Sequence, residues 1–278
     1  TIGAEKTKTV YFNLGSTVNY LQVPTNLRFK VFTQDKFERD EINHRIALGF
    51  FSGAYIIMLF YNLFIYFSTR DRNYIPYMVA LLGALLLTFH NSGYTVSILS
   101  AWENYVHMHS KMQFFLSQIL GSSMLIFTAW FLDVKNRYPK YYTVLKILLV
   151  IILFLPVPSL LGHANLNEKL SGLDGIVTMS FILILAIKSA LVRYPSSQFF
   201  LVGYGAFALG IIVILSTFIG VLPADVRDYY PLNIGSSIEM VFFSLALGNR
   251  INVLAKDNEL KQAEIIHQLH EKQELQVN

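Results

Sequence analysis

Apolar residues gather in long blocks along most of this chain. Seven blocks are each close to the length that an α-helix needs to cross ~30 Å of hydrocarbon at ~1.5 Å per residue. Short polar stretches with charges, prolines or glycines separate them. The expected spans cover residues 46–66, 74–89, 112–132, 142–161, 172–191, 199–221 and 231–249. The pattern predicts an all-α polytopic membrane protein with seven transmembrane helices.

The first 41 residues follow a different pattern. Turn residues such as Gly15 and Pro24 separate short apolar runs, and apolar and charged side chains alternate over residues 27–31. Both features are typical of β-strands. We expect residues 1–41 to be an extracytoplasmic strand remnant and linker, the end of a larger β domain. The transmembrane domain then covers residues 42–252, and a cytoplasmic signalling helix covers residues 253–278.

Two stretches make the span boundaries less regular. Residues 100–111 mix aromatic, acidic and histidine side chains, a composition that favours a short helix lying in the headgroup zone. Asp174 and Lys188 interrupt the apolar pattern of the fifth span. We therefore expect this span to begin only near residue 172.

The C-terminal segment after Arg250 is rich in charged and amide side chains and contains no proline or glycine. It is expected to continue the seventh helix into water. Ile251, Leu254 and Ile265 fit a heptad seam, but Lys261 and Gln268 occupy later core positions of the same heptads. A parallel coiled-coil homodimer and a solvated single helix both fit this pattern.

Basic residues are unevenly distributed between the two sets of alternate loops. The richer set holds Arg70, Arg72, Lys135, Arg137, Lys140 and Arg193, whereas the other holds Lys111, Lys169 and Arg227. The positive-inside rule puts the richer set in the cytoplasm. The N-terminal segment is then expected outside the cytoplasm and the C-terminus inside it.

Composition agrees with a membrane protein. Hydrophobic residues make up 54% of the chain and charged residues 14%, against roughly 25% charged in an average soluble domain. The absence of cysteine excludes disulfides, thiolate metal sites and cysteine nucleophiles. The net charge of +4 comes from basic residues scattered between apolar blocks, so we expect membrane lipid and no nucleic acid as a partner.

Several motifs resemble those of one known family. They are LGFFSG at 48–53, YNLF at 61–64 and RDRNY at 70–74 in the first span and its turn, then Gly235, Glu239 and SLALGNRI at 244–251 in the last span. With these motifs, residues 18–256 resemble the bacterial seven-transmembrane receptors with diverse intracellular signalling modules. Residues 20–39 also look like the closing strands and linker of the family's jelly-roll-like extracellular domain.

The resemblance implies a receptor in the bacterial inner (plasma) membrane. Its extracytoplasmic domain would bind a small molecule, of a carbohydrate type, and control a kinase, cyclase or phosphatase that follows the last helix. We expect such an output module as a partner in cis, beyond these 278 residues. The chain itself is expected to be no enzyme, with no cofactor and no metal.

Glu239 is the most informative polar residue, because it lies well inside the seventh span. A charge there costs ~2.5 to 3.5 kcal/mol. We expect it to face the interior, either protonated or hydrogen-bonded to small polar groups such as Ser122, Ser123 or Tyr204, and to help set the position of the last helix. A buried hydrogen bond without a switching role explains its presence equally well.

Five further residues complete a hypothetical signal-coupling set with Glu239. Asn62, beside Tyr61 in the first span, is costly in lipid unless it bonds across helices, and packing alone would explain it. Asp71 and Arg72 are expected to dock against the helix that leaves through Arg250, or to serve as interfacial anchors.

Two other functions are open alternatives. A transporter would have matched halves and paired intramembrane charges, which this sequence lacks. A seven-span zinc hydrolase would use inward His and Asp side chains, and His90, His107, His109 and His163 are predicted near the outer face. The hydrolase is the less favoured of the two, because no acidic cluster accompanies these histidines.

Overall fold

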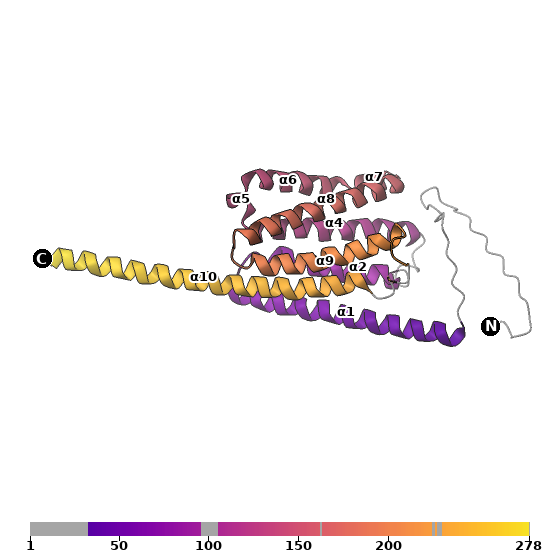
Figure 1. Ribbon diagram of the computed structural model, residues 1–278, viewed down its shortest axis with the longest axis horizontal. Coiled ribbons are helices and arrows are strands. Elements are labelled where there is room, and N and C mark those ends of the chain that lie inside the picture. Colours follow the sequence, from indigo (N-terminus) through magenta and orange to yellow (C-terminus); the bar gives the residue numbers. More distant parts are fainter. Residues whose placement is uncertain (1–32, 96–104, 162, 224–225, 227–229, 278) are drawn as a thin grey trace, which may run out of the picture. The chain divides into compact units, whose positions relative to one another are not determined.

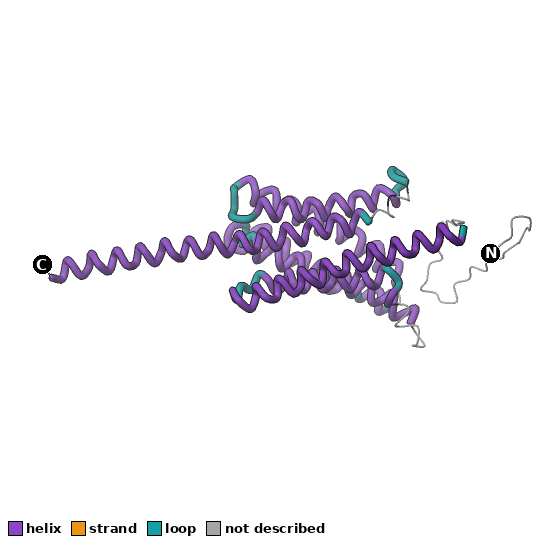
Figure 2. Tube along the Cα trace, turned by 90° about the horizontal axis from the view of Figure 1, so that it is seen from below, coloured by secondary structure: helices purple, strands orange, loops and turns teal. Residues whose placement is uncertain are grey.

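Helices dominate the part of the chain that the structure describes. The computed structural model describes all residues except 1–32, 96–104, 162, 224–225, 227–229 and 278. Its helices are α1 (Gln34–Thr69), α2 (Tyr74–Asn91), α4 (Tyr105–Phe131), α5 (Val134–Arg137), α6 (Pro139–Phe154), α7 (Val157–Leu160), α8 (Ala164–Leu191), α9 (Ser197–Phe218) and α10 (Pro231–Val277). Figures 1 and 2 trace them, and Figure 2 colours no described residue as strand.

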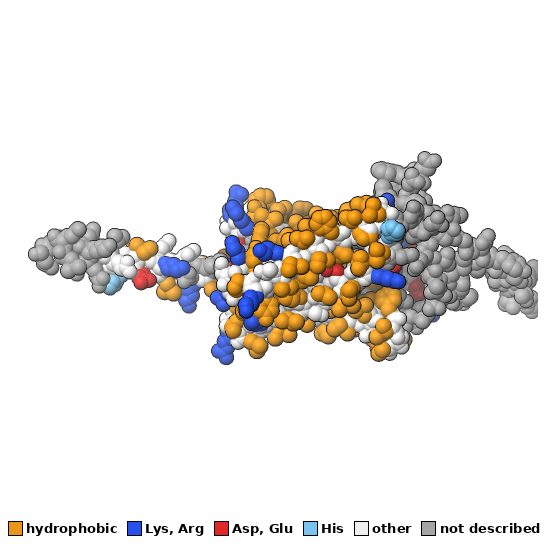
Figure 3. Space-filling view, turned by 90° about the horizontal axis from the view of Figure 1, so that it is seen from above, with side chains coloured by type: hydrophobic (Ala, Val, Ile, Leu, Met, Phe, Trp, Pro, Cys, Tyr) orange, Lys and Arg blue, Asp and Glu red, His pale blue; other side chains and the backbone are white. Residues whose placement is uncertain are grey.

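Among the described residues, seven helical segments are long and apolar enough to cross a membrane: α1, α2, α4, α6 with α7, α8, α9 and α10. They correspond one by one to the seven expected spans, so the predicted fold class is confirmed. Figure 3 shows hydrophobic side chains over much of one face of these helices. Among them, Phe50 is 70% exposed, Phe64 74% and Leu191 79%. Large apolar side chains so exposed require a hydrocarbon solvent.

The first helix begins earlier than the expected span. Residues 34–41, which were predicted to belong to the strand remnant and linker, form the first turns of α1. Side-chain pairs four residues apart stabilise these turns, including Gln34 with Glu38 at 2.9 Å and Arg45 with Glu41. The strands predicted within residues 1–32 lie outside the described residues.

Two other boundaries also differ from the expectation. Residues 105–111 are the start of α4 and not part of a separate surface helix, whereas residues 100–104 lie outside the described part. Helix α8 begins at Ala164, well before residue 172. Asp174 lowers the local hydropathy, but an aspartate inside a helix costs less than ~1 kcal/mol and does not end it.

The chain divides into two compact units, which we describe separately. The first contains residues 1–57, 79–125 and 143–178, of which 33–57, 79–95, 105–125, 143–161 and 163–178 are described. Within it, a Cβ placed on Gly83 would lie 3.5 Å from Leu120, and one on Gly121 would lie 3.6 Å from Ile152. The small residues of α2 and α4 therefore allow close helix packing.

The second unit contains residues 58–78, 126–142 and 179–278. It includes the turn between α1 and α2, the α4–α5–α6 connection, the turn between α8 and α9, and the whole of α10. Helices α9 and α10 lie side by side (Figure 1). These turns belong to the loops that are rich in Lys and Arg, and Figure 3 shows such side chains gathered where α10 leaves the other helices. The candidate site lies in this unit.

Candidate functional site

Aromatic side chains form the interior of the second unit around α10. Tyr77 of α2, Phe127 and Phe131 of α4, Phe200 of α9 and Phe243 of α10 are all at most 2% exposed. The Phe243 ring centre lies 4.8 Å from that of Phe200 and 5.1 Å from that of Phe127. Aromatic pairs at such distances add about 0.5–1.5 kcal/mol each beyond their burial. Phe243 therefore holds α10 against two other helices.

Glycines bring the backbones of α9 and α10 into close contact. A Cβ placed on Gly235 would lie 2.6 Å from the carbonyl oxygen of Ala206, and one on Gly210 would lie 2.7 Å from that of Pro231. Neither position has room for a side chain. The two helices are therefore packed along the first turns of α10 at a separation that only glycine permits.

Buried hydrogen bonds connect α10 to α1 and α2. Asn62 is fully buried, and its Nδ2 donates to Ser244 Oγ at 3.0 Å and to the Met58 carbonyl at 2.7 Å. The Tyr77 hydroxyl donates to the Met240 carbonyl at 2.6 Å. Met240 and Ser244 lie one helical turn apart on α10, so α1 and α2 contact the same face of it. The expected cross-helix bond of Asn62 is present.

Arg250 attaches α10 to the end of α4. Its Nη1 donates to the Phe131 carbonyl at 2.9 Å and to the Trp130 carbonyl at 3.3 Å, while its guanidinium carbon lies 5.5 Å from the Phe131 ring centre. The last carbonyls of a helix lack partners within the helix and carry partial negative charge. A cation at this position therefore caps α4 from a neighbouring helix.

Asn249 makes a further contact next to Arg250. Its Nδ2 donates to Ser196 Oγ, 3.0 Å away, in the turn between α8 and α9. Ser196 itself is buried, with a positive φ of 65°. Over three turns, α10 is thus bonded through residues 240, 244, 249 and 250 to α1, α2, α4 and the α8–α9 turn. All these contacts precede the point where α10 leaves its neighbours.

Glu239 lies on α10 next to this contact region. Its Oε1 is buried and has no hydrogen-bond partner among the described residues. The bonds predicted from Ser122, Ser123 or Tyr204 are therefore absent at this oxygen. Both serines instead donate to carbonyls of their own helix, Ser122 to Gln118 at 2.7 Å and Ser123 to Ile119 at 2.7 Å. Serine hydroxyls in helices commonly make this internal bond.

The other three candidates lie in different surroundings. Tyr61 is 51% exposed and makes no hydrogen bond with a described residue. Asp71 accepts from the backbone N of Asn73 at 2.9 Å and from its Nδ2 at 2.6 Å, so it shapes the turn before α2. Arg72 lines a pocket together with Arg250, and Asp71 is not among the residues that line it. The expected docking of Asp71 and Arg72 against the Arg250 helix stays a prediction.

Sequence analysis missed several residues of this region. Tyr77, Phe200 and Phe243 appeared only as apolar residues of their spans, and Trp130 and Phe131 contribute backbone carbonyls that no motif reveals. Ser244 and Asn249 lie inside the motif at 244–251, so their polarity within an apolar helix was the available signal.

The histidines form no metal site in the described part. No group of three or more His, Cys, Asp or Glu residues there could hold a metal ion. His163 is exposed, and His90 Nδ1 lies 3.2 Å from Thr95 Oγ1. The side chains of His107 and His109 lie outside the described part.

Comparison with known families decides what kind of protein this is. The family model described as 7TM diverse intracellular signalling matches residues 44–250, well over half of the 278 residues. The chain belongs to this family. The match includes all six residues of the hypothetical signal-coupling set, and it ends at Arg250.

Membership confirms the predicted resemblance and gives the chain a signalling role in a membrane. No curated protein and no solved structure matches the chain. Its biochemical details must therefore be argued from its own residues.

Proposed function

We propose that this chain is the membrane unit of a receptor that relays extracytoplasmic ligand binding to a cytoplasmic output module following α10. One observation carries the proposal: α10 is a single helix of 47 residues, Pro231–Val277. At ~1.5 Å per residue it is ~70 Å long, more than twice the ~30 Å of hydrocarbon. One rigid element therefore has a packed part among the other helices and a long part in water.

The packed part of α10 is where a signal would enter it. Hydrogen bonds from Asn62, Tyr77 and Asn249, together with Arg250, define one position of α10 relative to its neighbours. Beyond residue 254, the side chains described up to residue 268 are all exposed, so this part of α10 is not packed into a core. A rotation or shift at the packed end would reach the end of the helix, because a continuous helix moves as one body.

We assign the signal-coupling role to Glu239, Asn62, Arg72 and Arg250, with Asp71 shaping the adjoining turn. Tyr61 stays in the proposed set on the family resemblance alone. The buried Oε1 of Glu239 supports its inclusion, since a buried oxygen without a hydrogen-bond partner among the described residues favours a rearrangement that would supply one.

The proposed arrangement in the cell follows the distribution of basic residues. The loops rich in Lys and Arg would face the cytoplasm of a bacterial plasma membrane, with the N-terminal segment outside. Its partners would be a small extracytoplasmic ligand of carbohydrate type, the output kinase, cyclase or phosphatase in cis, and a second copy pairing through α10. Catalysis would belong to the output module and not to this chain.

Alanine insertions into the exposed part of α10 test the proposal. In the full-length receptor with its output module, one to seven alanines are inserted between Lys261 and Gln262. Each residue turns the following helix by ~100°, so seven residues restore nearly the original direction. We expect output, measured as enzymatic activity of the module with and without ligand, to vary with this period. Output that is equal for all insertions would contradict the relay, provided that the variants accumulate equally in membranes.

A further inference from the structure

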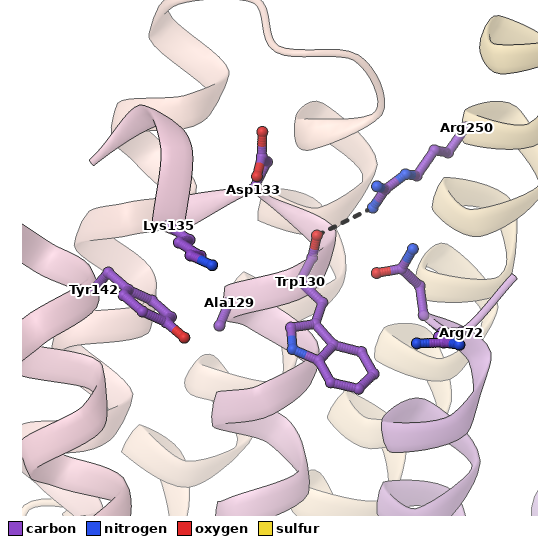
Figure 4. A pocket seen from close by; sticks show the side chains of 8 residues that line it. Arg72, Ala129, Trp130, Asp133, Lys135, Tyr142 and Arg250 are labelled. Carbon is purple, nitrogen blue, oxygen red and sulfur yellow. Dashed lines mark hydrogen bonds between the residues drawn. The ribbon is translucent and has the colours of Figure 1, made fainter. Parts of the chain in front are cut away.

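A basic pocket lies in the second unit beside Arg250. It has a volume of about 430 Å³ and is lined by Arg72, Asn73, Ala129, Trp130, Asp133, Lys135, Tyr142 and Arg250. Figure 4 shows Lys135 and Tyr142 on one side of Trp130, and Arg72 and Arg250 on the other. The residues come from the α1–α2 turn, from α4 to α6 and from α10. The pocket is therefore bordered by the α1–α2 turn, by the α4–α6 connection and by α10.

The charges of this pocket are unbalanced. Three cationic side chains face a single carboxylate, that of Asp133. Asp133 Oδ1 accepts from Asn136 Nδ2 at 2.7 Å and forms no ion pair with a described residue. Arg72 and Lys135 make no side-chain hydrogen bond or ion pair within the described part, and Arg250 bonds only to neutral carbonyls. The pocket thus has an excess positive charge that the described protein does not neutralise.

The surroundings of the pocket are those of a membrane interface. Trp130 is 46% exposed at the end of α4, and tryptophan is enriched at headgroup level. Arg72 and Lys135 lie within three residues of the apolar spans 74–89 and 112–132, and Tyr142 is the first residue of the span 142–161. Arginine and lysine pair with phosphate oxygens, and basic pockets between membrane helices bind anionic headgroups.

We propose that this pocket binds a phosphate-bearing anion, the headgroup of an anionic phospholipid or a free phosphate. Arg72 and Lys135 contact its oxygens from two sides, the Tyr142 hydroxyl donates a hydrogen bond, and Trp130 reports its presence. Because Arg250 lines the same pocket, the anion also strengthens the attachment of α10 to the end of α4. That last consequence rests on the proposed function, whereas binding itself does not.

Fluorescence of Trp130 tests binding directly. The chain has two tryptophans, so Trp102→Phe leaves Trp130 as the single reporter. This variant is placed in phosphatidylcholine nanodiscs with increasing phosphatidylglycerol in one arm and with added inorganic phosphate in the other. We expect a saturable change in Trp130 emission. A response in the first arm identifies a lipid headgroup, and a response in the second identifies free phosphate. Absence of a response in both arms would overturn the proposal.

Charge-matched pairs of substitutions separate the pocket from the general surface charge. Arg72→Gln with Lys135→Gln removes two pocket cations, and Lys140→Gln with Arg193→Gln removes two exposed cations outside it. Each basic residue contributes ~1 kcal/mol to binding. The pocket pair is therefore expected to raise the ligand concentration at half-saturation roughly tenfold or more, and the control pair less than about threefold. Equal weakening by both pairs would refute a pocket.

Conservative replacements guard against loss of folding. Arg72→Lys with Lys135→Arg keeps both charges and should retain the Trp130 response, which a damaged fold would lose. Receptor output measured on the pocket pair gives a separate result. Binding that depends on the pocket without an effect on output would leave the site intact and reject only its link to α10.

Discussion

At the scale of single residues, the polar side chains on α10 determine how it is held. Hydrogen bonds join α10 to its neighbours through Asn62, Tyr77 and Asn249. Apolar packing alone would not fix the rotation of α10, because it has no preferred orientation. Hydrogen bonds between membrane helices are worth about 1 kcal/mol or less, so several are needed to define one position. Their modest strength also suits the change of position that we propose for α10.

The bond between Asn62 and Ser244 is expected to have a measurable coupling energy. Asn62→Ala and Ser244→Ala should each destabilise the protein, and the double variant should cost about 0.6–1 kcal/mol less than their sum. Unfolding by increasing SDS in mixed micelles measures this. Thr69→Ala on α1 removes only local bonds, one to the Ile65 carbonyl and one from the Asp71 backbone N at 3.4 Å, and serves as the control. Additive effects at 62 and 244 would contradict the bond.

Replacement of Glu239 by Gln tests whether this residue takes part in switching. The glutamine amide can place its two N–H donors where the buried carboxyl oxygen lies. This changes the relative stability of the two positions that we propose for α10. We expect the ratio of stimulated to basal output of the full-length receptor to change about threefold or more. Ser237→Ala, which removes only a bond to the Asn233 carbonyl of α10 itself, should leave the ratio unchanged. An unaltered ratio in Glu239→Gln would assign this residue to packing.

At the scale of elements, α1 and α10 are longer than their apolar blocks, so hydropathy alone does not predict where they end. Both helices continue past their apolar blocks because the flanking residues are good helix formers with pairs four residues apart and no proline. The opposite case is the end of α6, where Pro156 follows Phe154 by two residues and a separate turn, α7, continues the span. Proline ends a helix because it has no N–H to donate.

The contact between α9 and α10 is expected to depend on glycine at defined positions. Gly235→Ala places a methyl group 2.6 Å from the Ala206 carbonyl, so the helices must separate, at a cost of about 1–3 kcal/mol. Gly248→Ala on the same helix meets nothing within 4 Å and should change stability by less than about 0.5 kcal/mol. Thermal unfolding in detergent compares the two. A Gly235→Ala variant as stable as Gly248→Ala would show that the contact is looser.

At the scale of the whole molecule, an odd number of spans would put the two ends of the chain on opposite sides of a membrane. The relay that we propose requires this topology, because the ligand and the output module must occupy different compartments. The six basic residues of one loop set against three in the other are the basis of the proposed direction.

Single cysteines are a direct measure of this direction, since the native chain has none. His163→Cys lies between α7 and α8 and should react with a membrane-impermeant maleimide in intact cells. Lys140→Cys, at the start of α6, should react only after the membrane is permeabilised. Both side chains are exposed, so access depends on the compartment alone. Reversed labelling would invert the proposed orientation.

Sequence alone determined the number, order and approximate limits of the spans. Each charged residue adds its own cost of burial in hydrocarbon, so uncharged apolar blocks can be recognised without knowledge of the fold. It also located Asn62 and Arg250 as polar residues needing a partner. Only the tertiary structure decided which partners they have, and that Tyr61 lies half exposed while Arg72, Lys135 and Arg250 surround one pocket. The physical reason is that a helix in lipid is apolar on every side. Without an amphipathic stripe, its sequence does not reveal which side meets another helix.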